Sequence, residues 1–166
     1  TLGYIQYYRR KPDLAIAELR HAIELNPNCS RAYGALGNIL SEFGDPEEAI
    51  KNNEIAIRYN PKDPGIYFCF QGLAFAHFSA GRYSEASRWA LKCVHRKPNW
   101  RGGHAVLAAS LAQLDLIEEA QEAVDNFLEN CPRETISKLR NAMIIAGKPD
   151  HVNRFEDGLR KAGLPE

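Results

Sequence analysis

The 166-residue chain lacks the features that mark a membrane protein or a nucleic-acid-binding protein. No segment holds the 18 or so uninterrupted apolar residues of a membrane span, since Ser110 and Gln113 interrupt the longest apolar stretch, Ala105 to Leu114. Lys+Arg and Asp+Glu number 21 each, so the chain has no net basic charge to attract phosphates. We therefore expect this region to bind neither a membrane nor nucleic acid.

The sequence also lacks every motif that would place a metal, a cofactor or a catalytic group. Its four cysteines have no CxxC or other metal-ligand spacing, and its five histidines form no HExxH and no pair at i, i+4. Neither GxxxxGK[ST] nor GxGxxG occurs, which leaves a nucleotide no recognisable loop. The acidic pairs Glu47-Glu48 and Glu118-Glu119 stand at expected helix starts, where carboxylates favour the helix dipole. We expect no metal site, no cofactor and no enzyme activity in this chain.

The first residues, Thr-Leu-Gly-Tyr, include no initiating Met and no basic-then-apolar signal pattern. We expect the chain to be part of a longer protein.

The cysteines need no disulfides in a helical chain of this size, and we expect reduced thiols and a cytoplasmic location. Hydrophobic residues at 45% and charged residues at 25% are ordinary for a globular fold.

What the sequence does contain is a repeat marked by four prolines. Pro27, Pro61, Pro98 and Pro132 lie 34, 37 and 34 residues apart. Three of them occur in similar phrases, LNPNC, YNPKD and RKPNW. A period near 34 residues with helical patterning and a terminal proline is typical of a helix–turn–helix solenoid.

Each unit has the same internal pattern of apolar and small residues. In the unit that ends at Pro61, Leu36, Gly37 and Leu40 share one face of the first helix, and Ala49 and Ala56 lie on the second. Small residues at the crossing let the two backbones approach closely. The next two units repeat the pattern with Leu73, Ala74, Ala86 and Cys93, and then with Leu107, Ala108, Ala120 and Phe127.

The pattern predicts an all-α fold of antiparallel helix pairs. Residues 1–132 form about three and a half units, the first truncated at its start, and residues 133–166 form a capping helix pair. The 37-residue unit has three extra residues near Lys62 to Ile66, which should lengthen the loop or add a turn to the next helix. The expected helices are 2–9, 12–25, 30–43, 46–59, 65–80, 83–96, 100–114, 117–130, 134–146 and 150–162.

These residues resemble the tetratricopeptide repeat family, through Leu36-Gly37, Ala49, Ala56 and Pro61 and their counterparts in the next two units. The resemblance implies a right-handed α-α superhelix. Three positions depart from the family pattern: His104 replaces the large aromatic early in a first helix, and Asn53 and Ala90 replace bulky second-helix residues. His77 also stands where an aromatic is usual, and we expect a packed histidine there rather than a ligand.

A narrower resemblance links the stretch Trp100 to Leu114 and the ending Arg154 to Glu166 to the C-termini of bacterial multidomain signalling proteins. In that group, tetratricopeptide repeats follow a class III adenylate/guanylate cyclase domain or a winged-helix regulator domain. It implies that this chain is a non-catalytic C-terminal module of such a protein.

The family resemblance implies that the first helix of each pair lines a concave binding face. Aromatic side chains there supply large contact areas at low entropic cost, although the same aromatics could pack between repeats. The candidate groove for a peptide or partner domain comprises Tyr4, Tyr7, Tyr8, Arg31, Asn38, Glu42, Phe68, Gln71, Phe75, Phe78, Ala105, Ala109 and Gln113.

Some relatives clamp a peptide's terminal carboxylate with Lys, Asn and Arg side chains. Here only Asn38 matches such a position, whereas Gly34, Gln71 and Phe75 stand where the others would be. We therefore expect an amphipathic helix or an extended apolar segment as ligand, not a chaperone tail.

Two hypotheses for the function follow. In the first, the chain is a protein-interaction scaffold of a larger bacterial signalling protein. In the second, it is a structural spacer or dimerisation module for an attached domain, with self-association through Thr1 to Arg10, whose missing neighbour leaves apolar surface uncovered.

Overall fold

The described part of the chain is helical. The computed structural model describes residues 12–43, 45–142 and 149–166, and no strand occurs among them. The helices are α2 (Pro12–Leu25), α3 (Ser30–Phe43), α4 (Pro46–Tyr59), α5 (Ile66–Ser79), α6 (Tyr83–Arg96), α7 (Arg101–Gln113), α8 (Ile117–Asn130), α9 (Ile136–Ala142) and α10 (Pro149–Lys161). The repeat pattern therefore predicted each helix start and end from α2 to α8 to within one residue. The predicted helix 2–9 lies outside the described residues.

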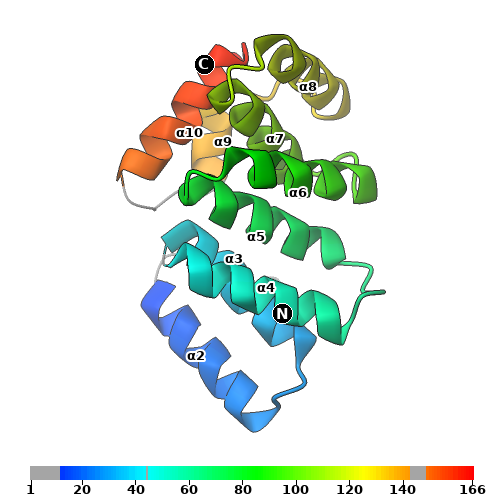
Figure 1. The fold of residues 1–166 in the computed structure, drawn as a ribbon, viewed down its shortest axis with the longest axis vertical. Coiled ribbons are helices and arrows are strands. Elements are labelled where there is room, and N and C mark those ends of the chain that lie inside the picture. Colours follow the sequence, from blue (N-terminus) through cyan, green and yellow to red (C-terminus); the bar gives the residue numbers. More distant parts are fainter. Residues whose placement is uncertain (1–11, 44, 143–148) are drawn as a thin grey trace.

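Successive helices pair along one axis. Helices α3 and α4, α5 and α6, and α7 and α8 form three antiparallel pairs, and the first helices of neighbouring pairs, α3 with α5 and α5 with α7, also pack together. Figure 1 shows this series running from α2 (blue) to α8 (olive) along the long axis of the molecule, with α10 (orange to red) beside its C-terminal end. The architecture is the predicted superhelix of helix pairs.

Small residues stand where the paired helices cross. Ala49, Ala86 and Ala120 are fully buried in the second helices. A Cβ added to Gly37 would lie 2.9 Å from the backbone nitrogen of Asn53, closer than such atoms approach. The small residue at this repeat position is therefore required by the close approach of α3 and α4.

Local side chains set several of the turns. The Asp45 carboxylate accepts hydrogen bonds from the backbone nitrogens of Glu47 and Glu48 at 2.8 and 3.4 Å, which caps α4. The turn between α7 and α8 has no glycine, and Asp115 takes the left-handed conformation there (φ 59°) that Gly81 takes in the preceding turn (φ 75°).

Two of the three extra residues of the second unit lengthen the loop before α5, and the third lengthens the turn between α5 and α6. Helix α5 begins five residues after Pro61, whereas α3 and α7 begin three residues after Pro27 and Pro98. Both α3 and α5 have 14 residues, so no turn is added. Asp63 holds the longer loop, because its carboxylate accepts a hydrogen bond from the Gly65 nitrogen at 2.7 Å.

The apolar core forms two clusters. The larger one lies around α5 to α8 and the C-terminal segment, and it includes Phe78, Val106, Phe127 and Phe155. The smaller one lies between α2 to α4 and α5: Leu36, Leu40 and Ala49 meet Ala76 of α5, and partly buried side chains of α2 and α4 pack against them. Among the described residues, no helix is long and apolar enough to cross a bilayer.

Candidate binding groove

The first helices of the pairs present the predicted groove residues to different extents. Arg31 is exposed, and Glu42, Phe68 and Gln113 are half-buried. Tyr4, Tyr7 and Tyr8 lie outside the described residues. The remaining members of the predicted groove are buried, namely Asn38, Gln71, Phe75, Phe78, Ala105 and Ala109.

Helix α10 covers the aromatic part of this face. The Phe155 ring lies 5.3 Å from the Phe75 ring and 5.5 Å from the Phe78 ring, and it meets the Phe78 ring edge-on. Phe75 and Phe78 are 6% and 2% exposed as a result of this packing and that of the helices around them. A partner cannot touch either ring while α10 is in place.

Helix α10 approaches the backbone of α7 directly. A Cβ on Gly158 would lie 2.8 Å from the Ala109 carbonyl oxygen, so only glycine allows this distance. Gln113 of α7 donates a hydrogen bond from Nε2 to the Arg154 carbonyl at 2.8 Å. Two of the predicted groove residues, Ala109 and Gln113, thus contact the chain's own C-terminal helix.

Charged contacts secure both sides of α10. The Arg154 guanidinium donates to the Ser79 carbonyl at the end of α5 and to the Tyr83 hydroxyl, at 3.3 and 3.4 Å. On the other side, Arg140 of α9 forms a two-point ion pair with Glu156, and Arg160 also reaches Glu156. The hydrogen bond from Arg140 holds the pKa of the Glu156 carboxyl below its usual value.

The N-terminal ends of α5 and α7 carry a separate aromatic group. Trp100 lies edge-on to Tyr67 and Phe68, with ring centroids 5.1 and 6.0 Å apart, and its indole donates to the Gln71 side chain. All three rings are half-buried, so they keep accessible surface. Phe68 is a predicted groove residue that keeps accessible surface, and Tyr67 and Trp100, which contact each other there, were not among the predicted groove residues.

A buried polar pair lies between α3 and α4. Asn38 donates to the Gly34 carbonyl at 2.8 Å and to the Asn53 side chain at 3.4 Å, and Asn53 donates to the Ala49 carbonyl at 3.0 Å. Asn53 is fully buried, which explains how an amide fits where a bulky apolar residue is usual. The Asn38 amide group is engaged within the protein rather than presented to a ligand.

The histidines singled out by the sequence are packed side chains. His104 is 2% exposed, stacks on Phe127 at 5.4 Å, and donates from Nε2 to the Pro98 carbonyl at 2.5 Å. The flat imidazole ring of His104 therefore packs where the tetratricopeptide repeat pattern has an aromatic side chain. Burial lowers the pKa of both His104 and His77.

Burial keeps two of the cysteine thiols unreactive. All four lie in the described ranges and are free. Burial raises the pKa of Cys69 to about 11 and that of Cys93 to about 12, which keeps both thiols protonated at neutral pH. No group of three or more His, Cys, Asp or Glu side chains in the described part of the chain could hold a metal ion.

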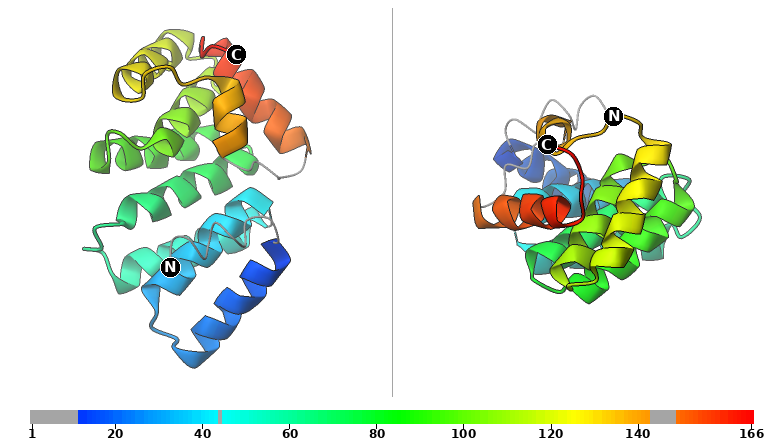
Figure 2. Two further views of the ribbon diagram at one scale, coloured as in Figure 1. Left: turned by 180° about the vertical axis from the view of Figure 1, so that it is seen from behind. Right: turned by 90° about the horizontal axis from the view of Figure 1, so that it is seen from above.

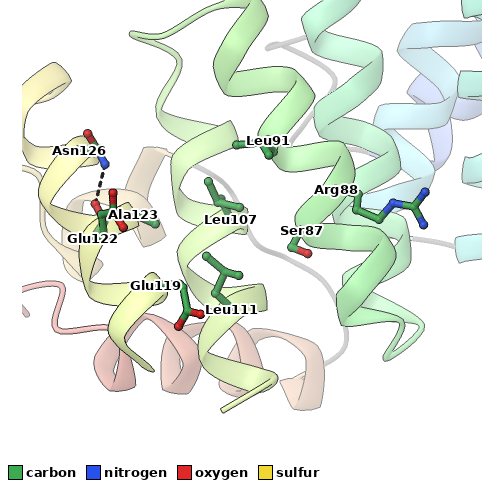
Figure 3. Close-up of a pocket in the computed structure, with 9 residues that line it drawn as sticks. All are labelled: Ser87, Arg88, Leu91, Leu107, Leu111, Glu119, Glu122, Ala123 and Asn126. Carbon is green, nitrogen blue, oxygen red and sulfur yellow. Dashed lines mark hydrogen bonds between the residues drawn. The ribbon is translucent and has the colours of Figure 1, made fainter. Parts of the chain in front are cut away.

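A second hollow lies away from the predicted groove residues, among α6, α7 and α8 (Figure 3). Leu91, Leu107 and Leu111 give it an apolar wall, and Leu91 is 44% exposed. The polar side chains at the hollow are Ser87, Arg88, Glu119, Glu122 and Asn126. Sequence reasoning did not single out this surface.

Sequence reasoning assigned residues 133–166 to a capping helix pair and did not predict that α10 occupies the groove. Phe155, Gly158 and Leu159 follow no repeat position, because the expected second-helix alanine is missing from this segment. The available signal was the glycine inside an amphipathic helix, which often marks a close backbone contact.

Comparisons with known proteins agree with this architecture. The family model described as "Tetratricopeptide repeat" matches residues 1–65. The "Hsp70-Hsp90 organising protein" of Plasmodium falciparum is 31% identical over 115 residues, which are 66% of this chain and 44% of that protein. The chain thus spans less than half the length of this relative.

Two solved structures share the fold over nearly the whole chain. The structure titled "Crystal structure of MamA" is similar at a TM-score of 0.67 and 16% identity, over 95% of this chain and 91% of that one. "YrrB: a TPR protein with an unusual peptide-binding site" is similar at a TM-score of 0.60 and 19% identity, over 96% of this chain and 81% of that one. At these identities the likeness concerns the fold.

Proposed function

Since this chain is built from tetratricopeptide repeats, we propose that it is a non-catalytic scaffold that binds a peptide or a partner domain on its concave face. Packed histidines and protonated thiols support a binding role rather than a catalytic one. We place it in the cytoplasm, where the four free thiols stay reduced.

The observation that carries this proposal is the accessible aromatic edge of the concave face. Phe68, Tyr67 and Trp100 form a half-buried aromatic group on α5 and before α7, and Arg31 at the start of α3 is exposed. Aromatic and arginine side chains are enriched among the residues that dominate binding energies at protein interfaces. The rigid helices α3, α5 and α7 hold this edge, so binding needs little ordering of the scaffold.

The relative's name raises chaperone segments as a possible ligand class. The groove does not favour a carboxylate clamp, because the Asn38 amide is buried and bonded to Gly34 and Asn53. Gln71 is bonded to Trp100, and Phe75 is packed against Phe155. The proposed ligand is therefore an apolar or aromatic segment.

The wider setting that we propose is the C-terminal region of a bacterial signalling protein, preceded by a cyclase or winged-helix domain. The alternative is a spacer that dimerises through Thr1 to Arg10, which lies outside the described residues. The reading frame upstream of Thr1 decides the setting. Sedimentation over a wide concentration range tests the dimerisation alternative, because a dimerising chain has an apparent mass that rises with protein concentration.

A capture experiment tests the groove. The immobilised chain is compared with an Arg31→Glu/Phe68→Ala variant and with Leu91→Ser, a matched change in the hollow among α6, α7 and α8. We expect the groove variant to lose at least about tenfold of the captured partner, as the loss of an interface anchor does, and Leu91→Ser to retain it. Full retention by the groove variant, with unchanged helical circular dichroism, would contradict the proposal.

A further inference from the structure

Helix α10 occupies the concave face, and the contacts of α10 indicate what kind of partner helix this face binds. Because α10 covers Phe75 and Phe78, we propose that the groove over α5 and α7 is a helix-binding site held closed by α10. A partner helix with the same contact pattern opens the site by displacing α10. The part of this inference that concerns a partner helix rests on the proposed function. The part that concerns the position of α10 in the groove does not.

The shape of the site selects a helix with one small residue. Ala105, Ala109 and Ala112 of α7 are fully buried and have short side chains, which lets the backbone of a packed helix come close to α7. The glycine of α10 sits against the Ala109 backbone, and the aromatic three residues before it lies against Phe75 and Phe78. A helix with a larger residue at the glycine position could not bring its aromatic to these rings.

The charge of the site adds a second requirement. Arg154, one residue before the aromatic, reaches the Ser79 carbonyl at the C-terminal end of α5. Carbonyls at a helix end carry partial negative charge and favour a cation. The matching partner is therefore an amphipathic helix with the sequence order arginine, aromatic, two variable residues, small residue, aliphatic, as in Arg154 to Leu159.

Other contacts of α10 come from its own C-terminal neighbourhood rather than from the repeats. Glu156 pairs with Arg140 and Arg160, and the Ile136 nitrogen donates to the Pro165 carbonyl at 2.8 Å. Gly163 ends the helix, and the Leu164 nitrogen donates to the Leu159 carbonyl at 3.0 Å. These contacts favour α10 over a free competitor, as does its covalent attachment, which gives an effective concentration on the order of millimolar.

A peptide added in trans tests the occupancy. The probe is a fluorescein-labelled peptide with the sequence of residues 149–166, titrated into the full chain and into Gly158→Val. The valine side chain prevents α10 of the variant from packing against α7, whereas the labelled peptide keeps the glycine and can still bind in the groove. We expect the variant to bind the peptide at least about tenfold more tightly than the unmodified chain does, because the tethered competitor is removed.

Two further variants complete the test. Asn153→Ala changes an exposed residue of α10 and should leave peptide binding as weak as in the unmodified chain. Phe155→Ala removes the aromatic contact without adding bulk and should also bind the peptide more tightly. Equal peptide affinity in all four proteins, or no binding by either opened variant, would overturn the inference.

Folding of the variants is itself informative. The proposal requires α2 to α8 to stay helical when α10 leaves, so the loss of helical circular dichroism should not exceed the share of α10. Collapse of the whole signal in both opened variants would show that α10 belongs to the core, and would overturn the inference. If the capture experiment fails but the labelled peptide binds the opened variants, the proposed function alone is rejected.

Discussion

At the scale of single residues, unusual side chains occupy ordinary repeat positions. His104 stacks on Phe127 where the family has a larger aromatic, and Asn53 is buried through hydrogen bonds to Asn38 and Ala49. The sequence predicted a packed role for His77 from its repeat position, and the lone, scattered histidines predicted no metal site. It could not predict the hydrogen bond of His104 to Pro98, because that contact depends on how the loop before α7 closes.

Buried His104 and half-buried His77 make stability depend on pH. The Nε2 of His104 donates to Pro98, so protonation would place a second proton on Nδ1, which is buried without a partner. Burial therefore lowers the pKa of His104, and that of His77, below the usual 6.5. As the pH falls below about 6.5, the unfolded chain takes up protons before the folded one does, and stability is lost.

We expect the free energy of unfolding to fall between pH 7.5 and 5.5, by at most about 1.4 kcal/mol per pH unit for each such histidine. Urea titrations at a series of pH values measure this slope. His104→Phe keeps a flat ring against Phe127 and should reduce the slope, and adding His77→Leu should remove most of the remainder. A slope unchanged in the double variant would show that other groups cause it.

At the scale of elements, the sequence predicted the helices better than their contacts. The starts and ends of α2 to α8 follow from the prolines, the capping residues and the apolar spacing, which are local signals. The longer loop at Asp63 was one of two predicted outcomes, and the hydrogen bond from Gly65 favours it. The packing position of α10 could not be predicted, because it depends on the contact of Gly158 with Ala109, and these two residues are distant in sequence.

The Asp45 cap gives a prediction for a single element. Its carboxylate accepts from two backbone nitrogens at the start of α4, whereas the residue before α8, Leu116, makes no such side-chain hydrogen bond. Asp45→Ala should lower the free energy of unfolding by about 1 kcal/mol, the usual value for a lost N-cap. Thermal or urea unfolding measures the change.

The matched control for the cap is Asp125→Ala, which removes an exposed aspartate from within α8. Alanine favours the helix interior, so this variant should be neutral or slightly more stable. Equal destabilisation by both substitutions would mean that charge, and not capping, accounts for the effect of Asp45.

At the scale of the whole molecule, the two core clusters should unfold at different denaturant concentrations. Stability in repeat proteins adds up from units and their interfaces, and the cluster around α2 to α4 is the smaller one. Both tryptophans report on the other end of the molecule: Trp89 packs on the larger cluster, and Trp100 contacts Tyr67 and Phe68.

We therefore expect the urea transition followed by circular dichroism to begin before the one followed by tryptophan fluorescence. A stability difference of about 1 kcal/mol between the clusters would separate the midpoints by roughly 0.5 M. Leu36→Ala, in the smaller cluster, should widen the separation. Coincident transitions in both proteins would indicate one cooperative unit.

The whole molecule also shows why the groove could be predicted only in part. The repeat positions assign Phe75, Phe78, Ala109 and Gln113 to one face of α5 and α7, since that face follows from helical periodicity, and all four contact α10. Whether the face is open or covered depends on α10, which lies beside α7 at the C-terminal end of the stack (Figure 2). We therefore propose the accessible edge at Phe68, with the exposed Arg31, as the place where a partner first contacts the scaffold.

Site-specific photo-crosslinking tests this account most directly. A benzophenone amino acid replaces Phe68 at the accessible edge of the groove in one protein and Leu91 in the hollow among α6, α7 and α8 in another, and both are irradiated in the source cells. The account predicts a discrete protein adduct from position 68 that is absent from position 91. An adduct from position 91 alone would show that the partner binds the other surface, and would contradict the account.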